Sequence, residues 1–551
     1  MGQRQSAEAW VAETERQRIC EEERLSLPPA VTAGLLKVLT GHASADERAD
    51  VTRRVHEYRG RSNRRVEWLL GILDPATALN AVLLQRATEK SAAAKYASEA
   101  GFNRFQWILA VAGKGTDASL GNFQLYAAAC GAWLATSRIL GVLAERDQEI
   151  SRGVQINPLQ ETQRRTWAVD VQFRWVSELF CRSMASEIES DPEKYCGLEL
   201  VTQRAVTDLF KWVEAYVDTM DRPADEKPNE QLPMPSTSAR PLVDSLSVRS
   251  DEYRFGSFEV LVETLDIESF PFVTLDGHVA PVALREATYG VELALLSLAR
   301  RRLGNDKVRS DLFENAVKRS LSQVIPSGMD IPFKPVFIPI PNSKNKGETD
   351  FLVRSSSQHT FVGECKAMSA VQSPSTVIHS FTDHVSKAAK QLKLRMEAIK
   401  AGTAVEVDGE IWDAPATNVY GLAVPLHSYG GAVWSHECLP HGDADSQDLA
   451  VIPIHHLLAV ARAMEDGQDL GEYIRFRKVL FDLSIELRDE LDILAAYIFS
   501  DGLTIASMIE SAPEHGLRVI RAYGVELEVL LSDTMPTSAR AWRRRLAKTL
   551  I

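Results

Sequence analysis

The sequence is poor in the features that mark secreted and membrane proteins. Its six cysteines are scattered and none form a C-x-x-C pair, which argues against a disulfide framework and favours free thiols in a reducing cytoplasm. The first residues, MGQRQSAEAWVAETER, are polar and charged, so we expect no signal peptide. The most membrane-like run, Leu125–Ala144, contains Arg138 and owes much of its apolar count to alanine. This run therefore predicts a buried bundle helix, and no membrane partner is expected.

Positive charge is also scarce overall, because 62 Lys and Arg face 75 Asp and Glu, giving a formal net charge of −13. This balance argues against indiscriminate coating of nucleic acid or of an anionic membrane. Residues 301–400 are the exception, since they hold 16 Lys and Arg against 9 Asp and Glu. A basic segment in an acidic chain is the footprint expected where one face meets a polyanion, and an ordinary solvated surface explains it equally well.

The chain of 551 residues is too long for one hydrophobic core, and its character changes along its length. Residues 1–222 show helical apolar spacing and hold seven of the ten tryptophans, which predicts a helical sensing or interaction domain. Residues 223–250 are predicted to be a linker, because Asp221–Pro241 is rich in proline, serine and charge. Residues 251–470 alternate between strand and helix patterns, and residues 471–551 are helical again. The prediction is a multi-domain, mostly α-helical protein with an α/β core.

The alternating region yields an ordered set of predicted elements. FEVLVETL and FPFVTL have the character of short strands, and a helix is expected near 282–303. The elements expected after them are helix 308–324, strands 333–340, 350–354 and 360–366, helix 381–401, strands 419–426 and 449–453, and helix 454–464.

Two carboxylates and a lysine stand out at the ends of two of these strands. Side chains at i and i+2 of a strand share a face, so Glu364 and Lys366 point the same way. Asp350 begins the preceding strand, and the polar interval 355–360 is short enough for a hairpin. Two adjacent antiparallel strands would then bring Asp350 close to Glu364.

Such a cluster predicts a divalent-metal site. Two carboxylates forced together repel, and one keeps its proton unless a cation neutralises them. Oxygen ligands suit Mg²⁺ or Mn²⁺, and Lys366 could orient or deprotonate an attacking water and offset charge on a phosphate. Glu314 lies at the edge of the apolar stripe of helix 308–324, where a carboxylate raises the energy unless it has a partner. The metal centre would be that partner.

A simpler interpretation of the same residues also stands. Glu364 and Lys366 could form an ion pair on a solvated sheet face, which contributes little stability. Asp350 could merely cap the turn after residues 344–347, and Glu348 competes with it as the first acid of the pattern.

These residues carry a resemblance to a known family. Asp350, followed by the tripeptide Glu-Cys-Lys at 364–366, resembles the PD-(D/E)xK motif of restriction-endonuclease-like nucleases. LFENAV, which contains Glu314, is similar to the helical glutamate that many members place before the core. KAAKQLKLRMEAI, which contains Gln391, resembles the helix that follows the lysine strand. The order of elements over about residues 300–465 resembles the αβββαβ core of the family, although no proline precedes Asp350.

The resemblance implies a chemistry and a set of roles. It implies an endodeoxyribonuclease that hydrolyses phosphodiester bonds with Mg²⁺ or Mn²⁺. It implies that Asp350 and Glu364 bind the metal with the Cys365 backbone carbonyl. Lys366 would act on the water, and Glu314 and Gln391 would support the site.

The biological setting follows by analogy only. Helical modules fused to such cores resemble bacterial restriction and anti-phage defence nucleases, which act in the cytoplasm. A homo-oligomer and a defence-system partner both fit the helical region. Two other functions remain open, namely an inactive nuclease fold that holds nucleic acid or a partner as a scaffold, and a helical scaffold with no nucleic-acid role.

Overall fold

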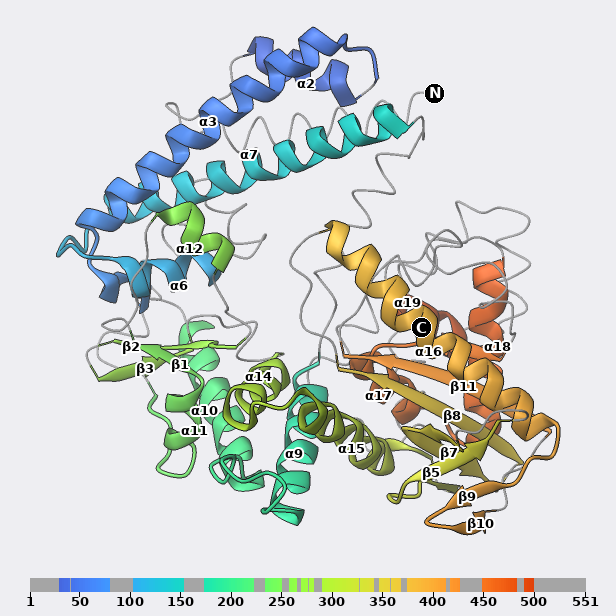
Figure 1. Cartoon of the computed structure of the whole chain (residues 1–551). Helices are drawn as coiled ribbons and strands as arrows, with labels where there is room; N and C mark the ends of the chain where they lie inside the picture. The colour runs from blue at the N-terminus through green and yellow to red at the C-terminus, as the bar shows by residue number, and fades with distance from the viewer. Residues whose placement is uncertain are drawn as a thin grey trace. The chain divides into compact units, whose positions relative to one another are not determined.

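The protein forms two compact units that interleave along the chain, as seen in the computed structural model (Figure 1). The first unit comprises Met1–Pro158 and Thr207–Leu298, and the second comprises Leu159–Val206 and Ala299–Ile551. The residues that the structure describes are 29–39, 41–79, 103–152, 173–221, 233–249, 257–264, 269–275, 277–281, 290–326, 328–340, 346–356, 358–367, 374–412, 417–426, 448–482 and 490–499. The coarse prediction of a multi-domain, mostly α-helical protein is confirmed, and the structure also contains mixed sheets.

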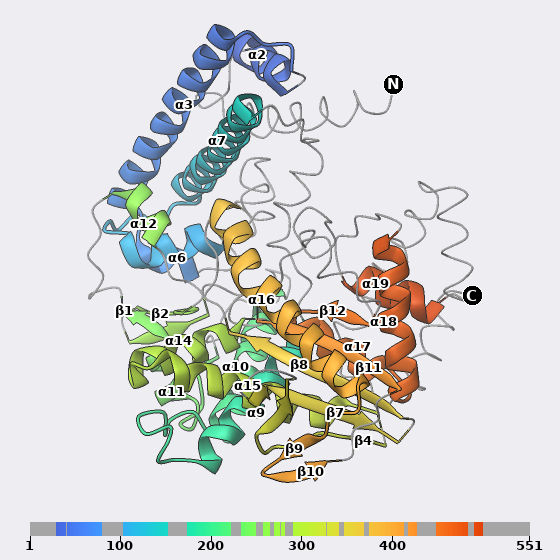
Figure 2. The ribbon, with the colours of Figure 1, turned by 45° about the vertical axis from the view of Figure 1, so that its right-hand side comes forward.

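Two long helices that run side by side dominate the first unit (Figures 1 and 2). Helix α3 (Ala45–Ile72) begins with a capping box, in which Ser44 and Glu47 satisfy each other's backbone N–H groups. Helix α7 (Leu120–Arg152) contains the predicted bundle helix 125–144, and Tyr126 to Ala129 are fully buried in it. The shorter elements are α2 (Pro29–Leu39), the 3₁₀ helix η1 (Pro75–Leu79) and α6 (Asn103–Ala112).

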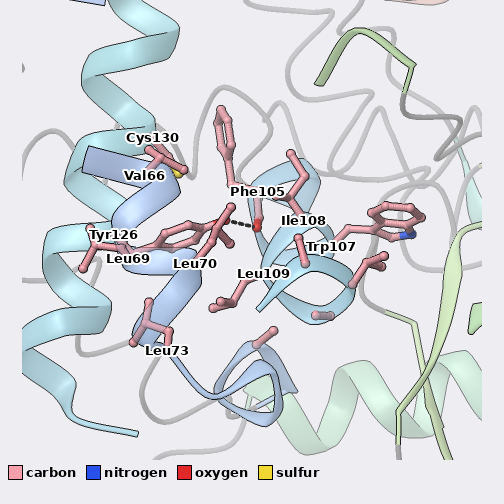
Figure 3. Packing of buried hydrophobic residues seen from close by; sticks show 14 of the residues in the cluster. Val66, Leu69, Leu70, Leu73, Phe105, Trp107, Ile108, Leu109, Tyr126 and Cys130 are labelled. Atoms are coloured by element: carbon pink, nitrogen blue, oxygen red, sulfur yellow. Dashed lines mark hydrogen bonds between the residues drawn. The ribbon is translucent and has the colours of Figure 1, made fainter. Parts of the chain in front are cut away.

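The core of this unit lies where α3, α6 and α7 meet (Figure 3). Leu69 and Trp107 are almost fully buried there, and the Tyr126 hydroxyl donates to the Phe105 carbonyl over 2.6 Å. Large aromatic and aliphatic side chains in such a core supply most of the stabilisation of a helical unit. None of the helices in the described ranges combines the length and the apolar character needed to cross a membrane.

A small sheet completes the first unit. Its strand order is β1-β2-β3, with β1 parallel to β2 and β2 antiparallel to β3. The Trp107 indole nitrogen donates to the Phe270 carbonyl over 3.1 Å and so ties α6 to the start of β2. The elements are α10 (Gln203–Asp221), α11 (Arg240–Ser245), β1 (Ser247–Arg249), α12 (Phe258–Thr264), β2 (Phe272–Leu275), β3 (His278–Ala280) and α14 (Val291–Leu303), of which α10 and α14 span the boundary between the units.

Several elements differ from the sequence-based expectation. FEVLVETL forms helix α12 rather than a strand, because Phe258 and Leu261 share one buried face at helical spacing. The region expected as a linker forms α11 and β1 after residue 239, since Leu242 and Val243 are fully buried. Residues 222–232 and 282–289 lie outside the described residues, as does most of the expected helical extension, 501–551.

The second unit begins with a helix that was expected to belong to the N-terminal domain. Helix α9 (Arg174–Ser190) packs against α15 (Asp306–Val324), with the rings of Phe180 and Phe313 edge to face at 5.7 Å. Arg319 of α15 also forms an ion pair with Glu187 of α9 at 2.8 Å. The amphipathic pattern of α9 shows which of its faces is buried, but not which helix covers that face.

A five-stranded mixed sheet forms the centre of the second unit, in the order β12-β11-β8-β7-β4. Strands β8, β11 and β12 are parallel, while β7 is antiparallel to β8 and β4 is antiparallel to β7. Their bounds are β4 (Met329–Asp330), β7 (Phe351–Ser355), β8 (His359–Lys366), β11 (Asn418–Pro425) and β12 (Leu449–Val451).

Helices cover both faces of this sheet. Helix α16 (Pro374–Lys400) crosses one face, and a Cβ at Gly421 of β11 would lie 2.7 Å from the Met396 sulfur of α16 (Figure 2). The next residue back, Tyr420, points to the opposite face, where its hydroxyl lies beside Gly471. The helices that follow β12 are α17 (Ile454–Ala463), α18 (Gly467–Asp482) and α19 (Glu490–Phe499).

The strand expected at 333–340, as the first strand of the α/β core, belongs instead to a second sheet of four strands. Residues 336–339 form β5 in a sheet of order β10-β9-β5-β6, whereas the short β4 lies beside β7 in the central sheet. The bounds are β5 (Val336–Pro339), β6 (Lys346–Thr349), β9 (Val405–Val407) and β10 (Glu410–Trp412). Strand β6 ends directly before Asp350, so this sheet fixes the backbone that leads into the candidate site.

Candidate functional site

The pairing of β7 with β8 brings Asp350 beside Glu364. Phe351 lies opposite Gly363 at the end of the register, so Asp350, which directly precedes β7, lies next to Glu364, which directly follows Gly363. A Cβ at position 363 would lie 2.0 Å from the Phe351 ring, so this close approach requires glycine. An Asp350 carboxylate oxygen accepts the Cys365 N–H over 2.6 Å, which fixes the side chain at the strand end. The hairpin geometry expected from the sequence is therefore present.

Glu364 is the most enclosed member of the group, with a residue exposure of 3%. The Lys366 ammonium lies 3.1 Å from one carboxylate oxygen, and the Arg395 guanidinium of α16 donates to the other. Arg395 also donates to the Glu348 carbonyl in β6, and its side chain is 7% exposed. The pair of Glu364 with Lys366 is not the solvated ion pair of the simpler interpretation, because their side chains are only 4% and 23% exposed.

Burial and repulsion raise the pKa of two carboxyls in the cluster. Burial first, and the Glu364 charge second, raise the pKa of Asp350 to about 6, against opposing effects of Lys366, the Cys365 N–H and Arg395. Burial first, and then the Asp350 charge, raise the pKa of Glu314 to about 8. Glu314 therefore belongs electrostatically to the cluster, as expected from its place at the edge of the α15 stripe.

Lys366 keeps its proton in this environment. Burial alone would lower the pKa of Lys366, but the Glu364 and Asp350 charges outweigh burial, and the pKa lies above its ordinary value. A lysine in this state donates hydrogen bonds and supplies positive charge, but it has no lone pair with which to accept a proton from water. Of the two roles considered from the sequence, the raised pKa of Lys366 favours orientation and charge stabilisation.

The remaining expected residues are placed less favourably. Gln391 lies on the exposed side of α16, one helical turn before Arg395, and the described contacts do not bring it to the cluster. The Cys365 thiol is buried, and burial raises its pKa, while its backbone N–H binds Asp350.

Arg395 is the site residue that sequence reasoning missed. Its signal is present in the sequence, because it shares the buried face of α16 with Leu392 and Ile399. An arginine on an apolar stripe needs a buried acidic partner.

The chemistry of the donors fits a hard divalent cation, although Glu364 already has two cationic partners. Asp350 and Glu364 offer carboxylate oxygens, and burial, followed by the Glu364 charge, raises the pKa of Asp350, so a cation at this place would favour its ionised form. Glu364 already binds both Lys366 and Arg395, so a cation there would share this carboxylate with them. In the described part of the chain, no group of three or more His, Cys, Asp or Glu side chains is placed to hold a metal ion.

Comparison of the chain with known proteins does not identify a family for this site. No family model matches the chain, and neither a curated protein nor a solved structure does so.

Proposed function

We propose that the second unit is a metal-dependent nuclease core that hydrolyses phosphodiester bonds, with DNA as the expected substrate. The observation that carries the proposal is the buried convergence of Asp350, Glu364 and Lys366 at the ends of paired strands. Perturbed carboxyl pKa values beside a lysine are typical of sites that handle charged substrates rather than of sheets that only need to be stable.

The order of elements supports the same proposal. Helix α15 precedes three strands of the central sheet, β4, β7 and β8, and then α16 and the parallel strand β11 follow. This order resembles the αβββαβ order of the restriction-endonuclease-like core, with β5 and β6 inserted before β7 and with β9 and β10 inserted between α16 and β11. The fold alone does not imply an activity, so the side chains carry the functional argument.

Each residue of the cluster has a distinct chemical task in this proposal. Asp350 and Glu364, with the Cys365 carbonyl, would hold Mg²⁺ or Mn²⁺, which when bound supplies Lewis acidity toward a phosphate and a water. The Lys366 ammonium stabilises negative charge that develops on the phosphate, and enclosure strengthens this effect. Arg395 holds the Glu364 carboxylate in place, and Glu314, with a pKa of about 8, carries a proton at neutral pH.

The test is cleavage by the full-length protein. Linear, circular and single-stranded DNA, and RNA, are incubated with Mg²⁺ or Mn²⁺ beside Lys366→Ala and Asp350→Asn. Nicking of circular DNA that falls at least about 100-fold in both variants supports the proposal. Lys387→Ala is the matched control, since this lysine is exposed on α16 and should leave cleavage unchanged. Equal cleavage by all four proteins would rule out this site.

A second candidate function is an inactive nuclease fold that only binds nucleic acid. It is favoured by one observation, namely that Lys366 and Arg395 already neutralise the Glu364 carboxylate without any metal. Binding that weakens with salt, without cleavage under any metal condition, would support this function. Absence of binding would support a scaffold with no nucleic-acid role.

We also propose that the helical first unit senses a trigger or a partner, in a restriction or anti-phage setting. Truncation at residue 222 is a poor test, because it would remove α9, which packs on α15 inside the second unit. Cleavage by the full-length protein with and without candidate triggers is the appropriate measurement.

A further inference from the structure

Helix α3 has a second side chain stripe that packing does not explain. Its buried stripe faces the core, as Val66, Leu69 and Leu70 show in Figure 3. Arg61, Arg64 and Trp68, which follow one another at three- and four-residue spacing, lie on the exposed side. Half-exposed Arg65 borders this stripe. We call Arg61, Arg64, Arg65 and Trp68 the α3 stripe.

The arginines of the α3 stripe are placed differently from those in the first half of the helix. Arg53 is paired with Asp50 at 2.5 Å and with Glu57 at 2.6 Å. By contrast, the Arg61 guanidinium lies 4.3 Å from the Tyr58 ring centre, and that of Arg65 lies 5.2 Å from the Trp68 ring centre. Among the described residues, no carboxylate forms an ion pair with any arginine of the stripe.

The two nearest acids on the helix are engaged elsewhere. Glu57 pairs with Arg53, and Glu67 accepts the Phe258 N–H of α12 over 3.2 Å and the Asn63 amide over 3.3 Å. Neither carboxylate forms an ion pair with Arg61 or Arg64 among the described residues. Within the described part of the chain, the stripe therefore presents positive charge that no carboxylate pairs with, in a protein whose net charge is −13.

Trp68 is an unusual tryptophan in this unit. It is 52% exposed, whereas Trp107, Trp133 and Trp212 are at most 5% exposed. Three residues beyond it, a Cβ added at Gly71 would meet no atom within 4 Å. An exposed indole with a guanidinium over it is a surface on which a nucleobase can stack.

We infer that the α3 stripe binds single-stranded nucleic acid, with the arginines on phosphates and Trp68 stacked on a base. Arg61 and Trp68 are seven residues apart, or about 10 Å along the helix, which spaces phosphate contacts and a stacking platform along one strand. The charge of the stripe specifies a polyanion, and the exposed ring specifies unpaired bases rather than a closed duplex. This inference concerns the first unit and does not depend on the nuclease proposal.

The test measures binding of the full-length protein to a fluorescein-labelled, mixed-sequence 20-nucleotide DNA or RNA by anisotropy. EDTA is present throughout, so that no metal-dependent cleavage takes place. Arg61→Glu/Arg64→Glu should weaken binding at least about tenfold and flatten its salt dependence, because fewer phosphates are neutralised. Trp68→Ala should weaken binding by about five- to 100-fold with an unchanged salt slope, while Trp68→Phe keeps most of the affinity.

The matched control is Arg53→Gln, which removes a paired arginine from the same helix and should leave binding unchanged. Helical circular dichroism and the melting temperature show whether each variant is folded. The inference is overturned if the stripe variants bind like the parent protein or if Arg53→Gln weakens binding equally. Preference for duplex DNA, or binding to vesicles of phosphatidylcholine and phosphatidylserine that is lost in the same variants, would also overturn it.

Discussion

The interiors of the two units differ in what they bury. In the core where α3, α6 and α7 meet in the first unit, two enclosed polar side chains are neutral and donate to backbone carbonyls, Tyr126 to Phe105 and Gln106 to Ala78, each over 2.6 Å. At the centre of the second unit, the sheet encloses carboxylates and cations that bond to one another, chiefly Glu364 with Arg395. The first interior is built for stability. The second accepts an energetic penalty for charge, which is the pattern expected where function rather than packing selects the side chains.

The largest effect is expected when one member of the buried ion pair between Glu364 and Arg395 is removed. Arg395→Met should lower the free energy of unfolding of the second unit by about 3–5 kcal/mol, because Glu364 and the Glu348 carbonyl lose their donor in an enclosed site. Urea denaturation measures the loss in free energy of unfolding, and amide hydrogen exchange of β8 shows that the loss lies in the second unit. Lys387→Met, at an exposed position on the same helix, is the control and should change stability by less than about 0.5 kcal/mol.

The double variant Arg395→Met/Glu364→Met separates charge from packing. Because it removes both ions together, it should be more stable than Arg395→Met alone. If the double variant lost as much free energy of unfolding as the two single variants together, Glu364 and Arg395 would not mainly compensate each other's charge.

The apolar interior should respond to cavity size alone. Leu109→Ala in α6 removes a side chain that is fully buried, and we expect a loss of about 2–5 kcal/mol. The loss should be the same at pH 5 and pH 8 and should not respond to Mg²⁺, since the described residues that pack in this core have apolar side chains or side chains that are neutral in this pH range. Val260→Ala, at a 49% exposed position in the same unit, is the control. A loss that depends on pH would show that the two interiors are not independent.

The pH dependence of stability should come from the charged interior. The folded-state pKa values of Asp350, about 6, and Glu314, about 8, lie above the ordinary values of 3.8 and 4.5. The folded protein therefore binds more protons than the unfolded chain between about pH 4 and 8, and its stability should fall as pH rises through this window. Asp350→Asn removes one such group and should stabilise the metal-free protein at pH 8 by about 1–3 kcal/mol.

Thermal unfolding of both proteins at pH 5 and pH 8 in EDTA measures this difference. Mg²⁺ should oppose the fall at pH 8 in the parent protein and should have less effect on Asp350→Asn. Parallel pH profiles for the two proteins would show that the Asp350 carboxyl is not held in an unfavourable environment.

The local part of the site could be predicted from the sequence, whereas its long-range part could not. Asp350 and Glu364 follow from two short strands and a hairpin, where the alternation of side chains and the length of the turn fix the register. Arg395 lies 31 residues beyond Glu364, and the resemblance drew attention to the neighbouring Gln391, which is exposed. An arginine within the apolar stripe of α16 was the available signal.

The fold shows the same division between local and distant information. The helices and strands around the site form close to their expected positions, because each has a clear period of its own. The partners of these elements are set by packing between distant segments, as in the case of α9 on α15. Such packing also explains why the two units alternate along the chain and why β4, rather than β5, lies beside β7. Neither feature produces a periodic pattern in the sequence.

The smallest expected effect concerns the start of α3, the helix that carries the α3 stripe. The Ser44 hydroxyl accepts the Glu47 N–H over 3.2 Å, and the Glu47 carboxylate accepts the Ser44 N–H over 2.8 Å. The Ser44 backbone N–H, followed by Lys37, lowers the pKa of Glu47 to about 2, so the box persists at mildly acidic pH. Ser44→Ala should reduce the stability of the first unit by about 1 kcal/mol, whereas Ser44→Thr should keep it. Hydrogen exchange in the first turn of α3 should rise in the alanine variant alone, while exchange around Leu69 stays slow. A similar rise at both places would mean that the cap stabilises the whole unit rather than only the end of one helix.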